Sequence, residues 1–148
     1  MALLPNVFVP EDAESMEFKV LPAGWYPAEI VKTEVKDTKD KTGKYIALKF
    51  RILENVEIDG VEVQSEGRFV FTNLNIVNKN ETAVRMARSD LKKICAAVGH
   101  ENELEDTVDL HNIDLQVKLS VKEATSEWPA KNEIKDYRFA DGSEVEFN

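Results

Sequence analysis

The sequence predicts a mainly β protein: a five-stranded, OB-fold-like Greek-key barrel with one helix between strands 3 and 4. Five segments carry the two-residue alternation or the β-branched and aromatic residues that are typical of strands. One segment, which follows the third of these strands, carries strong helical spacing. This order of elements is that of the OB-fold. Other small barrels and some α+β sheets share the order, and both stay open.

The composition indicates a single water-soluble domain. The 148 residues are close to the commonest domain size, and 43% of them are hydrophobic. The apolar runs are far shorter than the roughly 20 residues that a membrane-spanning helix needs. The first residues lack the basic region of a secretory signal. We therefore expect a cytoplasmic protein that is not attached to a membrane.

Three regions are expected along the chain. Residues 1–17 show no sustained periodicity and contain two prolines, which predicts an extended arm. Residues 18–139 contain the predicted strands and helix and form the domain. Residues 140–148 contain three acidic residues and no cation, which predicts a mobile acidic tail.

The first two strands are expected at residues 24–37 and 44–54, joined by a polar loop at 37–43. In the first strand, Lys32 and Lys36 alternate with β-branched residues and lie on the opposite face from them. In the second, the alternation is complete. Its apolar face consists of Ile46, Leu48, Phe50 and Ile52, and its other face of Tyr45, Ala47, Lys49 and Arg51.

The third strand is expected at residues 61–76, after a turn at Asp59-Gly60. We expect a bulge in it near Gly67, because an isolated glycine inside a strand pattern often marks one. The remaining two strands are expected at residues 114–124 and 132–139.

A helix is predicted over residues 78–99. Asn78 is suited to cap it, and Glu81 follows three residues later to complete a capping box. Gly99 is well placed to end it. The acidic segment at residues 100–112 is irregular, and a short second helix is one interpretation of it.

The charge is segregated along the chain. The formal net charge is −9, but residues 32–51 sum to +4 and residues 79–93 to +3, while residues 52–67 sum to −5. The potential of a binding face depends on such local sums more than on the total. Ordinary solvated surface is the alternative explanation of the same blocks.

The outer faces of strands two and three are the candidate binding surface, together with the loops that join strands one to two and four to five. In an OB-fold these parts contact oligonucleotides. Single-strand binders combine cations that follow the phosphates with aromatic rings on which unpaired bases stack. The candidate nucleic-acid-binding residues are Lys32, Lys36, Lys39, Lys41, Lys44, Tyr45, Lys49, Arg51, Arg68, Phe69, Phe71, Asn73, Asn75, Trp128 and Lys131.

Each aromatic candidate has a structural alternative. One face of the third strand must be buried, so Phe69 and Phe71 are core residues on one reading and stacking rings on the other. Trp128 lies in a polar loop before a proline, where a large ring has less structural reason to be, and we favour a binding role for it.

The sequence predicts neither an enzyme nor a metal or cofactor site. It contains no Gly-rich phosphate loop and no nucleophile motif. His100 and His111 are the only histidines, and their spacing from each other and from Cys95 matches no zinc pattern. We interpret Cys95 as a packed helix residue.

Several stretches resemble a phage-encoded family that is described as a domain of unknown function. They are LPAGWYPAEI at the opening, NLN before the helix, CAAVG at the end of the helix and NEIKDY near the close. The resemblance covers residues 18–139. Members of that family lie beside recombination and replication genes and are increasingly described as single-stranded DNA-binding proteins.

The resemblance implies a non-enzymatic single-stranded DNA-binding protein of phage DNA replication or recombination, located in the host cytoplasm. It also implies roles for Asn73, Asn75, Asn132, Glu133, Lys135 and Tyr137. Asn73 and Asn75 either contact nucleic acid or bond the backbone where the strand runs into the helix. The sequence departs from the family pattern in its acidic insert near residues 54–66 and in its acidic tail.

A second hypothesis is a protein-binding adaptor or a DNA-mimicking inhibitor of a recombination, repair or defence enzyme, because the overall charge is acidic. A virion structural protein and an enzyme without a motif also stay open. We expect the acidic tail to restrain DNA binding and to recruit replication or recombination proteins. The oligomeric state is left open.

Overall fold

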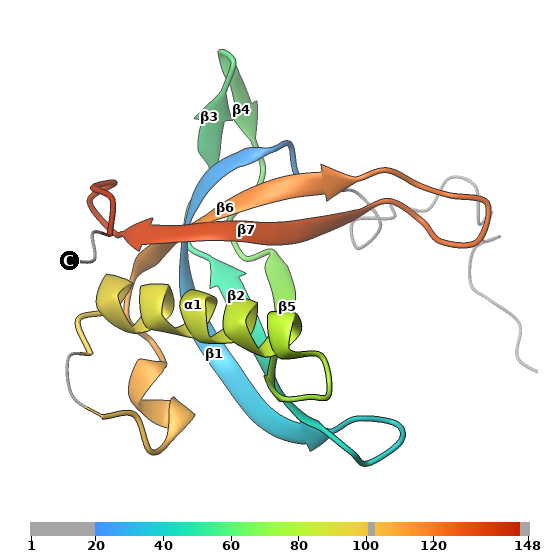
Figure 1. Ribbon diagram of the computed structural model, residues 1–148. Coiled ribbons are helices and arrows are strands. Elements are labelled where there is room, and N and C mark those ends of the chain that lie inside the picture. Colours follow the sequence, from blue (N-terminus) through green and yellow to red (C-terminus); the bar gives the residue numbers. More distant parts are fainter. Residues whose placement is uncertain (1–19, 101–102, 146–148) are drawn as a thin grey trace, which may run out of the picture.

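The computed structural model describes residues 20–100 and 103–145. In this part of the chain, five strands form one antiparallel sheet in the order β5-β2-β1-β6-β7 (Figure 1). Two short strands form a separate hairpin, and a single α-helix lies against the sheet. The mainly β prediction is therefore confirmed. The elements are β1 (Gly24–Asp37), β2 (Lys44–Ile52), β3 (Val56–Ile58), β4 (Val61–Val63), β5 (Phe69–Val77), α1 (Glu81–Ala97), the 3₁₀ turn η3 (Thr107–Leu110), β6 (Leu115–Lys122) and β7 (Lys131–Phe139).

The position of the helix differs from the prediction. The helix was expected between strands 3 and 4 of five, but it follows the fifth strand. Two additional strands are the reason: the segment expected as one strand at residues 61–76 is divided between β4 and β5, and β3 forms at Val56–Ile58, where no strand was expected. Between β4 and β5, Gly67 has a φ of 82°, and Ser65 is buried with its hydroxyl donating to the Glu54 carbonyl oxygen at 2.7 Å. The chain therefore turns at this point instead of bulging.

Strand β1 spans the sheet because it bends. Residues 24–28 pair with β6, and residues 28–37 pair with β2. The register shifts at Val31, which has no partner of its own on β2. A bulge of this kind bends a strand and increases its twist. The bend lets one strand join both halves of a curved sheet.

The core lies between the concave side of the sheet and α1. Phe50 of β2 and Tyr137 of β7 meet there with ring centroids 6.0 Å apart. Helix α1 packs against β5 and β7, which are the two edges of the sheet (Figure 1). An ion pair of 2.9 Å between Lys93 Nζ and Asp136 Oδ1 joins the helix to β7. The largest fully buried side chains include Tyr26, Ile30, Leu48, Phe50, Ile52, Ile94 and Leu115.

The helix begins two residues later than its sequence pattern suggests. Its N-cap is Asn80, whose side-chain oxygen accepts from the backbone N–H groups of Thr82 and Ala83 at 3.0 and 3.2 Å. Asn78 instead accepts from the N–H of Asn80. The predicted end is confirmed, because Gly99 has a φ of 79° directly after the cap residue.

The segments outside the sheet are partly described. The short second helix considered for residues 100–112 is the 3₁₀ turn η3. The described part of the tail folds back, since the Phe139 N–H donates to Ser143 O at 3.1 Å and Val145 packs against the core. The expected arm at residues 1–17 and the last three residues lie outside the described residues. No helix in the described part is long and apolar enough to cross a membrane.

We predict that Asn80→Ala lowers the free energy of unfolding by about 1 kcal/mol, because two N–H groups of the first turn lose their acceptor. Urea denaturation measures the loss. Asn78→Ala is the matched control and should cost less. A larger loss for Asn78→Ala than for Asn80→Ala would contradict the cap assignment.

Candidate nucleic-acid interface

The outer face of β2 and β5 carries exposed aromatic and cationic side chains in facing positions. In the antiparallel register, Lys49 of β2 lies opposite Phe71 of β5, and Arg51 lies opposite Phe69. Tyr45 lies opposite Asn75 on the same face. We call this surface the platform. It consists of Tyr45, Lys49, Arg51, Phe69, Phe71, Asn73 and Asn75.

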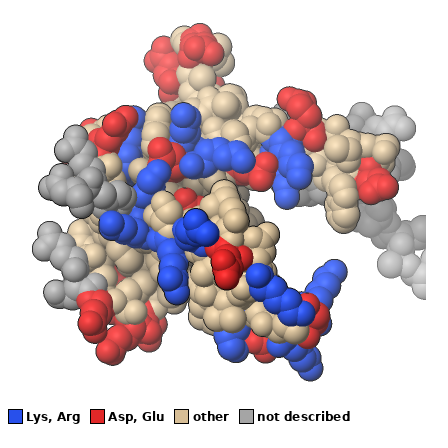
Figure 2. All heavy atoms as spheres, in the orientation of Figure 1, with Lys and Arg blue, Asp and Glu red and all other residues tan. Residues whose placement is uncertain are grey.

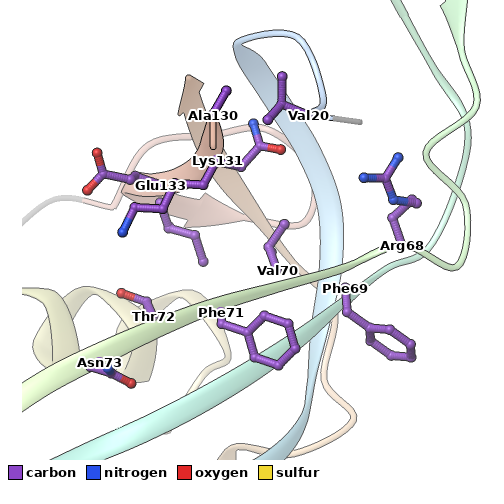
Figure 3. Close-up of a pocket in the computed structure, with 12 residues that line it drawn as sticks. Val20, Arg68, Phe69, Val70, Phe71, Thr72, Asn73, Ala130, Lys131 and Glu133 are labelled. Carbon is purple, nitrogen blue, oxygen red and sulfur yellow. The ribbon is translucent and has the colours of Figure 1, made fainter. Parts of the chain in front are cut away.

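Phe69 and Phe71 are stacking candidates and not core residues. Their side chains are 46% and 62% exposed, whereas Val70 between them is buried. Figure 3 shows both rings on the same side of β5, with Val70 and Thr72 on the other side. Two such rings at one edge of the sheet form an apolar surface that no element of the described residues covers.

Lys49 lies between the two rings. Its Nζ is 4.2 Å from the centroid of the Phe69 ring and 6.0 Å from that of the Phe71 ring. A cation within about 6 Å of an aromatic face is attracted by the ring quadrupole. Lys49 belongs to none of the ion pairs between described residues. The platform therefore presents one charge, held over its rings, that forms no ion pair with a carboxylate of the described residues.

The other cations on this face are paired with acids of β1. Glu34 binds both Lys32 and Lys36, at 2.9 and 3.3 Å, and hydrogen bonds from these two lysines lower the pKa of its carboxyl. Arg51 pairs with Glu29 at 3.2 Å. The pairs of Glu34 are exposed to solvent and contribute little to stability, so the two lysines can exchange this carboxylate for a phosphate at small cost. The Glu29 side chain is only 15% exposed, so Arg51 is held more firmly.

The β1–β2 loop presents Lys39 and Lys41 in a fixed turn. Asp40 between them accepts from the Thr38 hydroxyl and from the hydroxyl and N–H of Thr42, which lowers the pKa of its carboxyl to about 2. The two lysines are absent from the ion pairs between described residues, while Lys44 at the base of the loop pairs with Asp37 at 2.8 Å. The loop therefore adds two available cations.

A groove of about 540 Å³ runs along the platform between β5 and β7. Phe69 and Phe71 form its rim on β5, together with Arg68 (Figure 3). Lys131 and Glu133 of β7 line the opposite side of the groove. The groove exists because α1 covers only part of the space between the two edge strands. It connects the platform to the base of the loop at residues 123–130, which joins β6 to β7 and which we call the β6–β7 arm.

Trp128 lies in that arm, and its side chain is 71% exposed. Its backbone is fixed by Thr125, since the Trp128 N–H donates to Thr125 Oγ1 at 3.1 Å and Trp128 O accepts from the Thr125 N–H at 2.8 Å. The loop is therefore built without help from the indole ring. The ring is exposed in the described structure, and its role in binding stays a prediction.

Two residues for which the family resemblance implied a binding role stabilise the fold in the structure. Tyr137 is buried against Phe50 and cannot reach a ligand. Asn132 uses its amide to hold Leu21, accepting from the Leu21 N–H and donating to its carbonyl oxygen, both at 2.8 Å. It also donates to Ser120 O at 3.2 Å. Lys135 is exposed on β7, 3.9 Å from Glu133, and does not line the groove.

Charge on the visible face of the molecule is divided by element. Figure 2 shows lysine and arginine side chains over α1, over the β6–β7 ribbon and at the β1–β2 loop, while the tip of the β3–β4 hairpin is acidic.

Among residues 20–100 and 103–145, no cluster of three or more His, Cys, Asp and Glu side chains is arranged to hold a metal ion. His111 Nε2 lies 2.7 Å from Thr33 Oγ1 and thereby joins η3 to β1.

Some of these features carried no recognisable signal in the sequence. Glu29, which pairs with Arg51 of the platform, lies on a different strand, and only the β1–β2 register shows that the two side chains meet. The two sides of the groove lie more than fifty residues apart in the chain. Asn132 resembles any polar residue at the start of a strand.

One family model matches the chain. It is described as "Protein of unknown function (DUF669)", and it matches residues 8–144, most of the sequence. The comparison with curated proteins finds no match.

We predict that Asn132→Ala lowers the free energy of unfolding by roughly 1–3 kcal/mol, because it leaves the Leu21 N–H and carbonyl groups without partners. Lys131→Ala, at the exposed neighbouring position, is the control and should have little effect. Urea denaturation of both variants gives the comparison. Unchanged stability of Asn132→Ala together with weakened oligonucleotide binding would restore Asn132 as a ligand contact.

Proposed function

We propose that this chain, which belongs to the DUF669 family, is a non-enzymatic protein that binds and coats single-stranded DNA. The observation that carries the proposal is the platform, where two exposed phenylalanine rings flank one lysine that has no carboxylate partner among the described residues. Stacking of a base on an aromatic ring is worth roughly 1–3 kcal/mol and tolerates any sequence. Rings that face water give no such stabilisation to the fold itself.

The geometry favours unpaired bases over duplex. Phe69 and Phe71 are two positions apart on one strand, so their attachment points are separated by about 6.8 Å. Stacked bases of a duplex strand are about 3.4 Å apart. Two neighbouring bases can therefore occupy the two rings only in an extended strand. In a duplex the base faces are covered by their stacking neighbours.

Few cations are available to bind the phosphates of the DNA, and they are spread over the platform, the β1–β2 loop and the groove. Lys49 lies within the platform, Lys39 and Lys41 lie in the β1–β2 loop, and Lys131 lies across the groove. Each phosphate contact releases counterions and steepens the salt dependence of affinity. With so few cations, we expect the affinity to fall only moderately between low and physiological salt.

The strand order supports an OB-like interpretation of the fold. If the β3–β4 hairpin is treated as an insertion, β1, β2 and β5 precede the helix and β6 and β7 follow it. The first four of these strands then lie in the spatial order 4-1-2-3 of a Greek key, with the fifth beside the fourth. In OB-folds the face of the second and third strands binds oligonucleotides. The platform occupies that face.

The place of action is inferred from the family resemblance alone. We propose a role in phage DNA replication or recombination, in the host cytoplasm, with DNA as the principal ligand. The acidic tail is a candidate contact for replication or recombination proteins. Val145 packs against the core, while Asp141 and Glu144 of the same segment are exposed and can meet a partner.

We predict that Phe71→Ala weakens binding of a labelled oligo-dT by roughly 1–3 kcal/mol and Phe69→Ala by a similar amount, because each removes one stacking surface. Fluorescence anisotropy measures both, and circular dichroism checks the fold. Val108→Ala, an exposed apolar position on η3, is the matched control and should bind like the parent chain.

The parent chain should also bind the single strand more tightly than a duplex of the same length. Equal or tighter duplex binding would contradict the proposal. So would phenylalanine variants that fold and bind oligo-dT with unchanged affinity.

A further inference from the structure

The β3–β4 hairpin projects from the body of the molecule and carries unbalanced negative charge (Figure 1). Glu57 and Glu62 lie directly opposite each other in its register. Like charges in facing positions destabilise a hairpin. Neither glutamate belongs to an ion pair between described residues. Val61, beside them, is 64% exposed.

The hairpin is nevertheless held in one conformation. Its turn residues Asp59 and Gly60 have φ values of 52° and 79°, which is the left-handed geometry of a tight hairpin turn. At its base, the Asn55 side chain accepts from the Glu66 N–H at 3.0 Å. The charged and apolar side chains of the hairpin are therefore presented at a fixed place.

A groove of opposite charge lies between the end of β5 and the first half of α1. It has a volume of about 400 Å³. Arg85 and Arg88 of α1 line it, three residues apart on the helix, together with the apolar side chains of Ile76, Val77 and Val84 and one acid, Glu81. Neither arginine belongs to an ion pair between described residues. Neighbouring like charges on a helix repel each other.

The hairpin and the groove lie at opposite ends of the strand that carries the platform. The chain enters β5 at Phe69 directly after the hairpin and leaves it at Val77 in the groove. The nine residues of β5 extend over about 27 Å. The hairpin therefore cannot reach the groove of its own molecule, but the hairpin of another copy can.

We propose that the β3–β4 hairpin of one copy docks in the β5–α1 groove of the next copy, so that copies line up head to tail along single-stranded DNA. Glu57 and Glu62 would meet Arg85 and Arg88, and Val61 would cover the apolar floor of the groove. Each contact relieves a repulsion that both surfaces carry in the isolated molecule. This assembly rests on the proposed DNA binding.

A head-to-tail contact between copies would make DNA binding cooperative. Because its two halves lie at the ends of β5, head-to-tail docking brings the end of one copy's platform close to the start of the next. Such a contact uses different surfaces on the two partners and can extend without closing. A single small hairpin makes a weak contact, but neighbours on one strand are held at high effective concentration. The result is cooperative coating.

Reversal of charge on either surface tests the contact. Glu57→Lys with Glu62→Lys, and separately Arg85→Glu with Arg88→Glu, should each abolish cooperativity on long poly-dT while binding of a short oligo-dT that holds one copy persists. An equimolar mixture of the two variants should restore it, because each hairpin then meets a groove of opposite charge. Glu103→Lys with Glu105→Lys controls for the change in net charge of the hairpin variant.

Fluorescence titrations of the short and long probes separate the two proposals. Failure of the parent chain to bind the short probe contradicts DNA binding itself. Binding to the short probe with no cooperativity on the long one overturns the docking alone. A mixture that stays non-cooperative also overturns it. If the arginine variant loses affinity for the short probe, the groove is a DNA contact and the docking proposal is wrong.

Discussion

The alternation of the β2–β5 ladder is the constraint on which the rest of the structure depends. Leu48, Phe50 and Val70 must be buried to form the core, and antiparallel pairing then places Lys49, Phe69 and Phe71 on the other face. A shift of one residue in this register would expose the core and bury the lysine. The fold and the candidate site are therefore two faces of one pairing, and neither can change without the other.

Much of the fold could be predicted from periodicity. The first strand was expected at residues 24–37 and has those bounds, and the glycine at the end of α1 lies where it was expected. Local patterns were less informative where two nearby residues are equally suited to the same role. Asn78 and Asn80 are both suitable caps, and only the backbone geometry selects Asn80. The turn at Asp59-Gly60 was expected and forms, but β3 was missed and β4 was joined to β5, because each of these two strands is only three residues long.

The sequence predicted which residue types make up the candidate site, but not which of them are exposed and which are buried or bonded within the fold. The pattern of β2 placed Tyr45, Lys49 and Arg51 on one face, and the register confirms that placement. It did not decide between the two readings of Phe69 and Phe71, because either face of β5 could have been the buried one. Sequence resemblance marked Asn132 and Tyr137, whose roles in the structure are a backbone clamp and a core ring. Long-range hydrogen bonds and burial carry no local sequence signal.

The central claim is that the outer face of β2 and β5 receives single-stranded DNA. Titration of the isotopically labelled chain with a short oligo-dT, followed by backbone amide chemical shifts, locates the contact residue by residue. We expect the largest shifts at Tyr45, Lys49, Phe69 and Phe71, with smaller ones in the β1–β2 loop. Shifts concentrated on α1 or on the β3–β4 hairpin, or no shifts at saturating DNA, would contradict the account.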